Sequence, residues 1–252
     1  MAEDVAQSNY CAFDGRSLTR PFDPQPPSAL TAYVHDAFRS LVLNAQYSCL
    51  GGRAAIRQNN YRFGLYERLA SRTSALGLAR DLQRFAGDAP LAAKPLTAFV
   101  ASFTGPNPHD EAEFEALLWQ TLQQLSDLDQ EDWAPDRSPD PDDTRFSFSF
   151  SRTAFFIVGL HAGSSRVARR FAWPTIVFNP HEQFDQLRRD GRYERFQRLI
   201  RGADVALQGS INPMLANFGE RSEARQYSGR AVDDEWRCPF HAKSGAGGGE
   251  TP

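Results

Sequence analysis

Two β-strands in residues 146–160 constrain the fold of this chain more than any other feature of the sequence. Phe146, Phe148 and Phe150 alternate with serines, and a period of two is typical of a strand that buries one face. The uninterrupted apolar run 154–160 follows closely, and such a run is typical of a central strand covered on both faces. Strands that follow one another through short loops suggest an antiparallel sheet.

The rest of the chain alternates between helical and strand patterns. Apolar residues recur at helical spacing in 29–44 and 111–128, and the paired glycines 51 and 52 are expected to end the first of these regions. We expect further helices at 62–75, 76–85 and 188–202, and further strands at 96–103 and 174–178. These elements predict an α+β fold, with a mostly antiparallel sheet and helices on one side of it.

Length and composition favour one folded domain. The 252 residues are 41% hydrophobic, which suffices for a sizeable core. We expect residues 1–28 to form a flexible N-terminal arm, 29–242 to form a single α+β domain, and 243–252 to be a disordered tail. The acidic, proline-containing segment 127–143 is expected to be a surface loop.

Charge and motif content exclude several classes of protein. Twenty-eight basic against 31 acidic residues give a net charge of −3, so no global basic field favours nucleic acid. No stretch predicts a signal peptide or a membrane span, and we expect a cytoplasmic protein without a membrane partner. The three cysteines form no disulfide framework and no zinc-binding spacing, and nucleotide-binding loops are absent.

His161 is the first candidate metal ligand. It ends the run 154–160, and a strand end is a rigid platform for a side chain. Arg166, Arg169 and Arg170 follow within nine residues. An imidazole beside guanidinium groups suits a haem whose iron binds the nitrogen and whose propionates bind the arginines. The alternative is a hydrogen-bonded strand-end histidine beside a solvated loop.

His181 is the second candidate. Asn179, Pro180 and His181 are typical of a helix start, with the asparagine as N-cap and the proline in the first turn. A helix N-terminus disfavours imidazolium, so the ring is expected to be neutral, as a ligand or a base must be. The alternative is a histidine that only caps and packs. In a hairpin of 154–160 with 174–178, His161 and His181 would lie at opposite ends.

Two cysteines and a long polar segment are the remaining candidates for a functional site. Cys238 and Cys49 could each supply a thiolate ligand to haem, or a nucleophile for a metal-free enzyme, although a buried apolar role is the ordinary alternative. The segment 209–230 combines turn residues with polar side chains and is a candidate functional loop, or an ordered loop without a ligand.

Four segments resemble one known family. They are YSCLGGRAAIRQNNYRFGLY at 47–66, FFIVGLHAGSSRVARRF at 155–171, IVFNPHEQF at 176–184, and the stretch from QGSINPMLANFGERSEARQYSGR to WRCPF at 208–240. The chain is similar over residues 35–241 to the YqcI/YcgG family, and within it to haem-dependent guanidine N-hydroxylases. In that family the loop after the strand usually reads Leu-His-Pro, and here Ala162 stands in place of the proline.

The resemblance implies a haem b enzyme that uses O₂ to hydroxylate a guanidino nitrogen of arginine or of a cyclic arginine-derived guanidine. It would need an electron donor, and a homodimer is compatible with it. On this basis Glu220 and Glu223 are expected to hold the guanidinium, with Tyr227 as a nearby donor. The expected iron ligand is His161, then His181, then Cys238. If His181 is not the ligand, it could relay protons. The alternative is a protein that binds or senses haem without catalysing a reaction.

Overall fold

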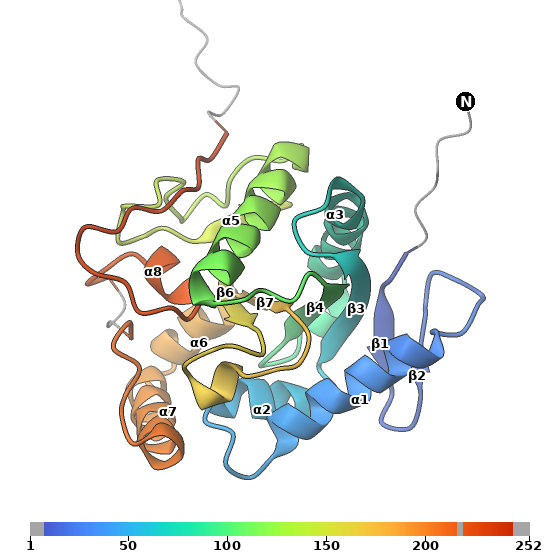
Figure 1. The fold of residues 1–252 in the computed structure, drawn as a ribbon, viewed down its shortest axis with the longest axis horizontal. Coiled ribbons are helices and arrows are strands. Elements are labelled where there is room, and N and C mark those ends of the chain that lie inside the picture. The colour runs from blue at the N-terminus through green and yellow to red at the C-terminus, as the bar shows by residue number, and fades with distance from the viewer. Residues whose placement is uncertain (1–7, 216–218, 244–252) are drawn as a thin grey trace, which may run out of the picture.

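A seven-stranded sheet in the order β2-β1-β3-β4-β7-β6-β5 forms the centre of the molecule (Figure 1). The computed structural model describes residues 8–215 and 219–243. The strands are β1 (Cys11–Phe13), β2 (Leu18–Thr19), β3 (Tyr61–Arg68), β4 (Ala98–Gly105), β5 (Phe148–Phe150), β6 (Thr153–Leu160) and β7 (Thr175–Pro180). The helices are α1 (Ala29–Leu43), α2 (Leu50–Arg57), α3 (Arg72–Ala86), α4 (Ala89–Ala92), α5 (Glu111–Leu128), the 3₁₀ turn η1 (Val167–Arg169), α6 (Glu182–Arg189), α7 (Tyr193–Gln208) and α8 (Ala224–Tyr227).

The pairing of the strands confirms the α+β class. Neighbouring strands pair antiparallel except β3 and β4, which pair parallel and are connected in sequence through α3. A parallel pair needs such a crossover, because a tight turn can only reverse the chain.

The β5–β6 hairpin confirms the two strands that the sequence predicts, with one correction. Phe148 pairs with Phe155, and Ser151 and Arg152 make the turn in the left-handed backbone region, with φ of 50° and 60°. The serines on the other face of β5 are also buried, because the loop before β5 covers them. The Ala134 N–H of that loop donates to Ser149 Oγ at 2.9 Å. This strand therefore has two buried faces instead of one.

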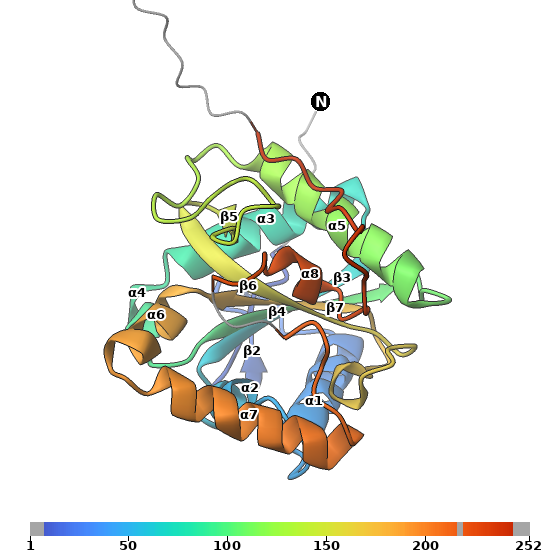
Figure 2. The same ribbon diagram turned by 90° about the vertical axis from the view of Figure 1, so that its left-hand side faces the viewer.

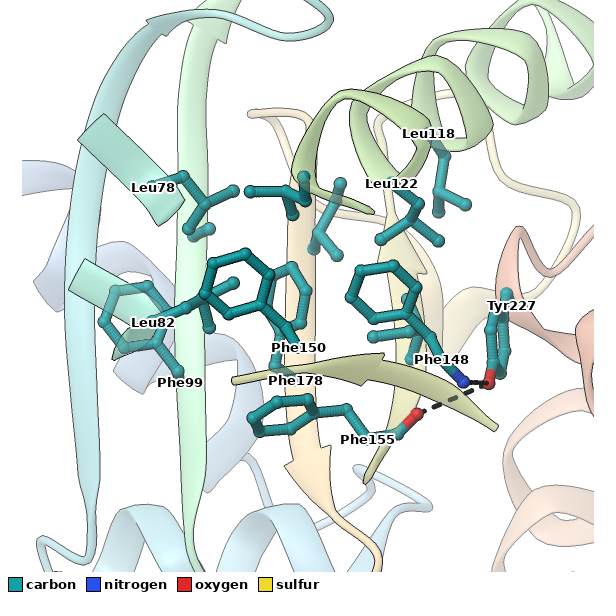
Figure 3. Close-up of a cluster of buried hydrophobic side chains, with 14 of the residues drawn as sticks. Leu78, Leu82, Phe99, Leu118, Leu122, Phe148, Phe150, Phe155, Phe178 and Tyr227 are labelled. Atoms are coloured by element: carbon teal, nitrogen blue, oxygen red, sulfur yellow. Dashed lines mark hydrogen bonds between the residues drawn. The ribbon is translucent and has the colours of Figure 1, made fainter. Parts of the chain in front are cut away.

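Helices cover both faces of the sheet, which corrects the expectation of one covered face. In Figure 2, α3 and α5 lie on one side and α1, α2 and α7 on the other. The α3–α5 side contains the larger aromatic core, with Leu78, Leu122, Phe148, Phe178 and their neighbours closely packed (Figure 3). The α1–α2 side contains a smaller core. Phe155 of β6 is buried in the larger core, while Phe156 packs at the edge of this core and lines a cavity with Phe184 of α6 and Phe196 of α7.

Several predicted boundaries are wrong. The expected helix 62–75 is strand β3 followed by the start of α3. The glycines at 51 and 52 lie inside helix α2 rather than ending a helix. The expected helix 188–202 is two helices, α6 and α7, separated by a turn at Gly191, whose φ is 66°.

The chain ends also differ from expectation where the structure describes them. Part of the expected flexible arm, residues 11–13 and 18–19, forms strands of the sheet. The expected tail 243–252 lies outside the described residues except for Lys243. Within 8–215 and 219–243, no helix combines the length and apolar composition that crossing a membrane requires.

Candidate functional site

A hollow region lies between strands β6 and β7 and the two helices α6 and α7. It consists of two cavities. The His181 cavity is lined by His181 and Arg188 among others, and the Arg169 cavity by Cys49, Arg166 and Arg169 among others; their empty spaces of about 850 and 1010 Å³ both include open solvent. Phe156, Phe184 and Phe196 line both, so the two cavities adjoin. Largely apolar walls are typical of sites for small organic ligands or cofactors.

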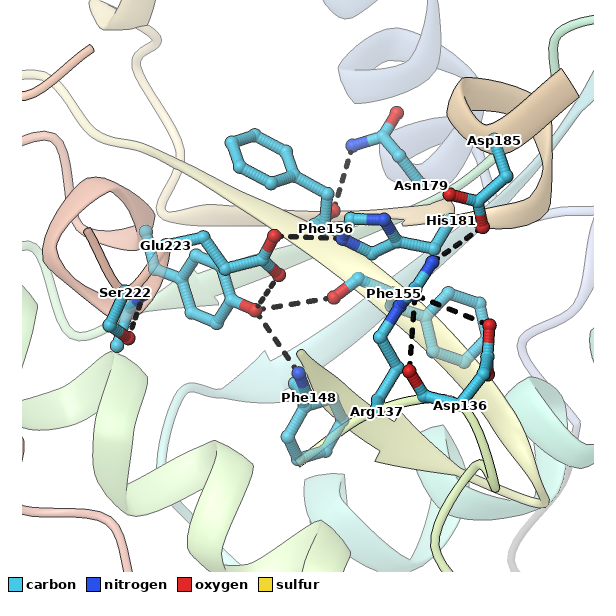
Figure 4. Close-up of polar contacts among 12 residues, drawn as sticks. Asp136, Arg137, Phe148, Phe155, Phe156, Asn179, His181, Asp185, Ser222 and Glu223 are labelled. Atoms are coloured by element: carbon cyan, nitrogen blue, oxygen red, sulfur yellow. Dashed lines mark hydrogen bonds and ion pairs between the residues drawn. The ribbon is translucent and has the colours of Figure 1, made fainter. Parts of the chain in front are cut away.

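His181 lies at the end of β7 and is buried. Its Nε2 lies 2.8 Å from Glu223 Oε2, and its Nδ1 has no hydrogen-bond partner (Figure 4). A carboxylate accepts hydrogen bonds, and in the neutral imidazole tautomer with its proton on Nε2, the Nδ1 atom keeps a free lone pair. A buried nitrogen without a hydrogen-bond partner lowers the stability of the folded state. In a residue that lines a cavity, this atom is a candidate ligand for a metal ion or a hydrogen-bond acceptor for a bound molecule.

Glu223 is held in turn by Tyr227, one helical turn further along. The Tyr227 hydroxyl donates to Glu223 Oε1 at 2.5 Å and accepts from the Phe148 N–H at 3.1 Å. Burial raises the pKa of Tyr227 well above its ordinary value, so the hydroxyl keeps its proton. The chain Tyr227–Glu223–His181 therefore fixes the orientation and tautomer of the imidazole. Each of these three side chains is a predicted site residue, and the structure brings them together.

The predicted N-cap arrangement around His181 is wrong. Asn179 and Pro180 belong to β7, and His181 itself occupies the N-cap position of α6 without a side-chain capping bond. The Asn179 side chain instead donates to the Phe156 carbonyl of the neighbouring strand at 3.1 Å. The imidazole is thus free of the capping role and turns towards Glu223.

His161 lies in a different environment. It is fully buried, its ring stacks on Phe114 of α5 at 4.4 Å, and neither ring nitrogen has a partner. Burial lowers the pKa of His161. His161 lines neither cavity, and β6 separates it from His181 by its full length, as predicted.

The three arginines after His161 contact protein groups and not its ring. Arg166 forms a buried ion pair with Asp204 of α7. Arg169 donates to the carbonyls of Gln226 and Tyr227, both at 2.9 Å. Arg170, at the surface, donates to the Ser164 carbonyl at 2.7 Å. Arg166 and Arg169 do line the Arg169 cavity, so two of the three predicted anion-binding groups are available to a ligand there.

The cysteines and Glu220 take up other positions. Cys238 packs in the larger core, and burial raises its pKa to about 12, so it stays a thiol. Cys49 caps α2 by accepting from the Gly52 N–H and lines the Arg169 cavity, and burial raises its pKa too. Glu220 is exposed and lines neither cavity, whereas Glu223 is buried and lines the His181 cavity.

Asp204 is a site residue that the sequence analysis missed. Its carboxylate accepts from Arg166, from Ser48 Oγ at 3.3 Å and from the Asn212 N–H at 2.9 Å. It is the only described residue of α6 or α7 in the buried class. The sequence does contain a signal for this residue. Asp204 is a single acidic residue on the apolar face of α7, one helical turn after Ile200. Asp204 anchors α7 over the cavities.

The residues present fit a haem at His181 and not at His161. Haem iron needs only one protein ligand, apolar walls for the macrocycle and cationic groups for the propionates. His181 supplies an unpartnered nitrogen at a cavity with aromatic walls, and Arg188, Arg201 and Arg221 also line that cavity. In the described part of the chain, no cluster of three or more His, Cys, Asp or Glu side chains is arranged as a metal site.

Comparison with known proteins identifies the family. No solved structure matches the chain. It is 25% identical over 207 residues to the Uncharacterized protein YqcI of Bacillus subtilis (strain 168), an alignment that covers 77% of this chain and 80% of the relative. Residues 38–241 match the YqcI/YcgG family. Since that match spans most of the sequence, the chain belongs to the YqcI/YcgG family.

Proposed function

We propose that this protein is a haem b-dependent monooxygenase that N-hydroxylates a guanidino group, with the haem in the His181 cavity. One observation carries the haem assignment: His181 is buried at a cavity with Nε2 bonded to Glu223 and Nδ1 without a partner. This replaces His161 as the expected iron ligand with the second-ranked candidate. The guanidine substrate rests on the resemblance of four sequence segments.

In this proposal the side chains of the protein prepare the iron ligand before the cofactor arrives. Glu223 keeps the imidazole proton on Nε2, and its negative charge makes Nδ1 a stronger electron donor. Tyr227 holds the carboxylate in place. Phe156, Phe184 and Phe196 would give a bound haem apolar walls. Bound haem would supply the activation of O₂, which no amino-acid side chain provides.

The proposed reaction needs O₂ and an electron donor in addition to the guanidine. One oxygen atom of O₂ forms the new N–O bond and the other leaves as water, so two electrons and two protons must be delivered for each turnover. The electrons come from an external donor. The carboxylates that line the cavities, Glu223 and Asp204, are already bonded to His181 and Arg166. A guanidinium would therefore share these acceptors or bind against the propionates of the haem.

Two alternatives have weaker support. A haem-binding or sensing protein without turnover would use the same ligand and walls. A metal-free cysteine enzyme would use Cys49 or Cys238, but burial raises the pKa of both thiols, which disfavours the nucleophilic thiolate.

The test is expression with a haem supply, a visible spectrum of the purified protein, and incubation with arginine, a reductant and O₂. We expect Soret absorbance and a product heavier than arginine by one oxygen atom in the mass spectrum. Soret absorbance without product from arginine or cyclic guanidines would favour the sensing role. Absence of Soret absorbance would overturn the proposal.

A further inference from the structure

We propose that the Arg169 cavity contains a carboxylate-binding subsite centred on Arg169, for an acid group carried on an apolar frame. The subsite lies next to the His181 cavity and extends the function proposed above, but it does not require that haem be the ligand. Its basis is the placement of a half-buried guanidinium, the charge of the cavity walls and the chemistry of the surrounding side chains.

Arg169 is a half-buried cation that forms no ion pair with an acidic residue of the described part of the chain. Its guanidinium donates to the carbonyls of Gly159, Gln226 and Tyr227, and no carboxylate of residues 8–215 or 219–243 forms an ion pair with it. Burial lowers its pKa to about 10, which leaves it charged at neutral pH. A guanidinium has five N–H donors, and at most three are used here. The charge and the free donors can both be satisfied by an anion in the cavity.

The lining residues leave the Arg169 cavity with an excess of positive charge. Arg166, Arg169 and Asp204 are the charged residues of the Arg169 cavity, so their sum is +1. In the His181 cavity, Arg188 and Arg221 form ion pairs with Asp185 and Asp234. Arg166 pairs with Asp204, so the unbalanced positive charge of the Arg169 cavity is that of Arg169, in a chain whose net charge is −3. Positive charge concentrated in a cavity of an acidic protein selects for an acidic ligand.

The surroundings of Arg169 define the rest of the ligand. Tyr47 and Cys49 lie beside it on the cavity wall, and burial raises the pKa of both, so neither competes as an anion. The first turn of α2, with Gly51 and Gly52, also lines the cavity and adds the positive end of its dipole. The other walls are mainly aliphatic and aromatic. They fit a ligand with an apolar body and a carboxylate at one end.

Two ligands offer this chemistry: the propionate of a haem, or a small carboxylic acid that enters beside it. Two matched pairs of probes distinguish them. Haem and haem dimethyl ester differ only in the propionate charges and are titrated by absorbance. The small acid 4-phenylbutyrate and its amide differ only in the carboxylate and are titrated by calorimetry, with the protein as purified and after haem loading.

We expect the wild-type protein to bind the acid at least about tenfold more tightly than its neutral analogue in one pair or both. Preference within the haem pair identifies a propionate, and preference within the small pair identifies a free acid. Arg169→Gln should reduce the preference to near unity. Arg195→Gln, which removes an exposed arginine of α7, should leave it unchanged. Equal binding of acid and neutral analogue in both pairs would overturn the subsite.

The wild-type comparison needs no variant, so it stands even if Arg169→Gln fails to fold. A folded Arg169→Gln protein that keeps the wild-type preference would also overturn the assignment to Arg169. The result is separable from the proposed function. A protein that shows no Soret absorbance but prefers 4-phenylbutyrate over its amide would refute the haem enzyme and support the subsite.

Discussion

His181 Nε2 and Glu223 Oε2 lie 2.8 Å apart, although 42 positions separate them in the sequence. Both side chains are buried, and the contact connects the end of strand β7 to the short helix α8. A carboxylate on one ring nitrogen leaves the other nitrogen as the electron donor, which is the arrangement around which the candidate site is built.

Glu223→Gln should lower haem affinity by about 10- to 100-fold. The amide has one acceptor oxygen where the carboxylate has two, so it cannot accept from both His181 and Tyr227. The measurement is a haem titration followed by absorbance. Glu235→Gln removes an exposed carboxylate near the same helix and should bind haem like the wild type. Equal affinity of Glu223→Gln and wild type would show that the carboxylate does not prepare the ligand.

Tyr227→Phe should destabilise the fold by about 1–3 kcal/mol. The substitution removes a hydroxyl that accepts from the Phe148 N–H and donates to Glu223, and it leaves both groups buried without that partner. The measurement is the free energy of unfolding in denaturant. Tyr33→Phe, at a side chain that is 65% exposed, should change it by less than about 0.5 kcal/mol. Equal losses of unfolding free energy in Tyr227→Phe and Tyr33→Phe would show that the Tyr227 hydroxyl does not stabilise the fold.

Asp204→Asn should loosen helix α7. The carboxylate anchors this helix through Arg166, and its removal leaves a buried guanidinium without its counter-ion. We expect amide hydrogens of residues 193–208 to exchange at least about tenfold faster while those of β6 and β7 do not change, since local opening needs no global unfolding. Glu194→Gln, an exposed position on the same helix, should exchange like the wild type. Uniform acceleration across the sheet would instead indicate global destabilisation.

His161→Phe should stabilise the protein by about 1 kcal/mol at neutral pH, because it removes two buried nitrogens without partners. Burial lowers the pKa of His161 in the folded state, so the unfolded chain takes up its proton first. Stability is therefore complete above the ordinary value of 6.5 and is lost as the pH falls from there towards the folded-state pKa.

The measurement for His161→Phe is the free energy of unfolding at several pH values from 7.5 to 5. The loss on acidification should be smaller in the variant than in the wild type. It should not vanish, because burial also lowers the pKa of His35. A variant that is less stable than the wild type at neutral pH would contradict this prediction, and one that loses haem would indicate that His161 has the function assigned to His181.

Local patterns in the sequence predicted the elements whose periodicity is unambiguous. Helix 111–128 and strand β6 are found where they were expected, because the apolar residues of the helix fit one period and those of β6 form one uninterrupted run. Strand β3 was predicted as a helix, since Phe63, Tyr66 and Leu69 also fit helical spacing. In the structure β3 pairs in parallel with β4, and this pairing favours a strand over a helix. The contact is between distant segments, so the residues of β3 alone do not predict it.

Three members of the candidate site were predictable from the sequence, but their arrangement was not. His181, Glu223 and Tyr227 were each identified, and the last two are separated by one helical turn. His161 ranked first because three arginines follow it in sequence. In the structure those arginines bind Asp204 and backbone carbonyls, and Phe114 covers the ring. Proximity in sequence does not establish convergence in space. The cavities depend on where α6 and α7 lie over the sheet, which no local pattern encodes.

The most direct test of the account is the ferrous carbon monoxide spectrum of His181→Gly after haem reconstitution, with and without added imidazole. We predict that the wild type and His161→Phe give the same haem spectrum, that His181→Gly loses it, and that imidazole, by filling the space left by the side chain, restores it. A His181→Gly protein that keeps the wild-type spectrum without imidazole would show that His181 does not bind the iron.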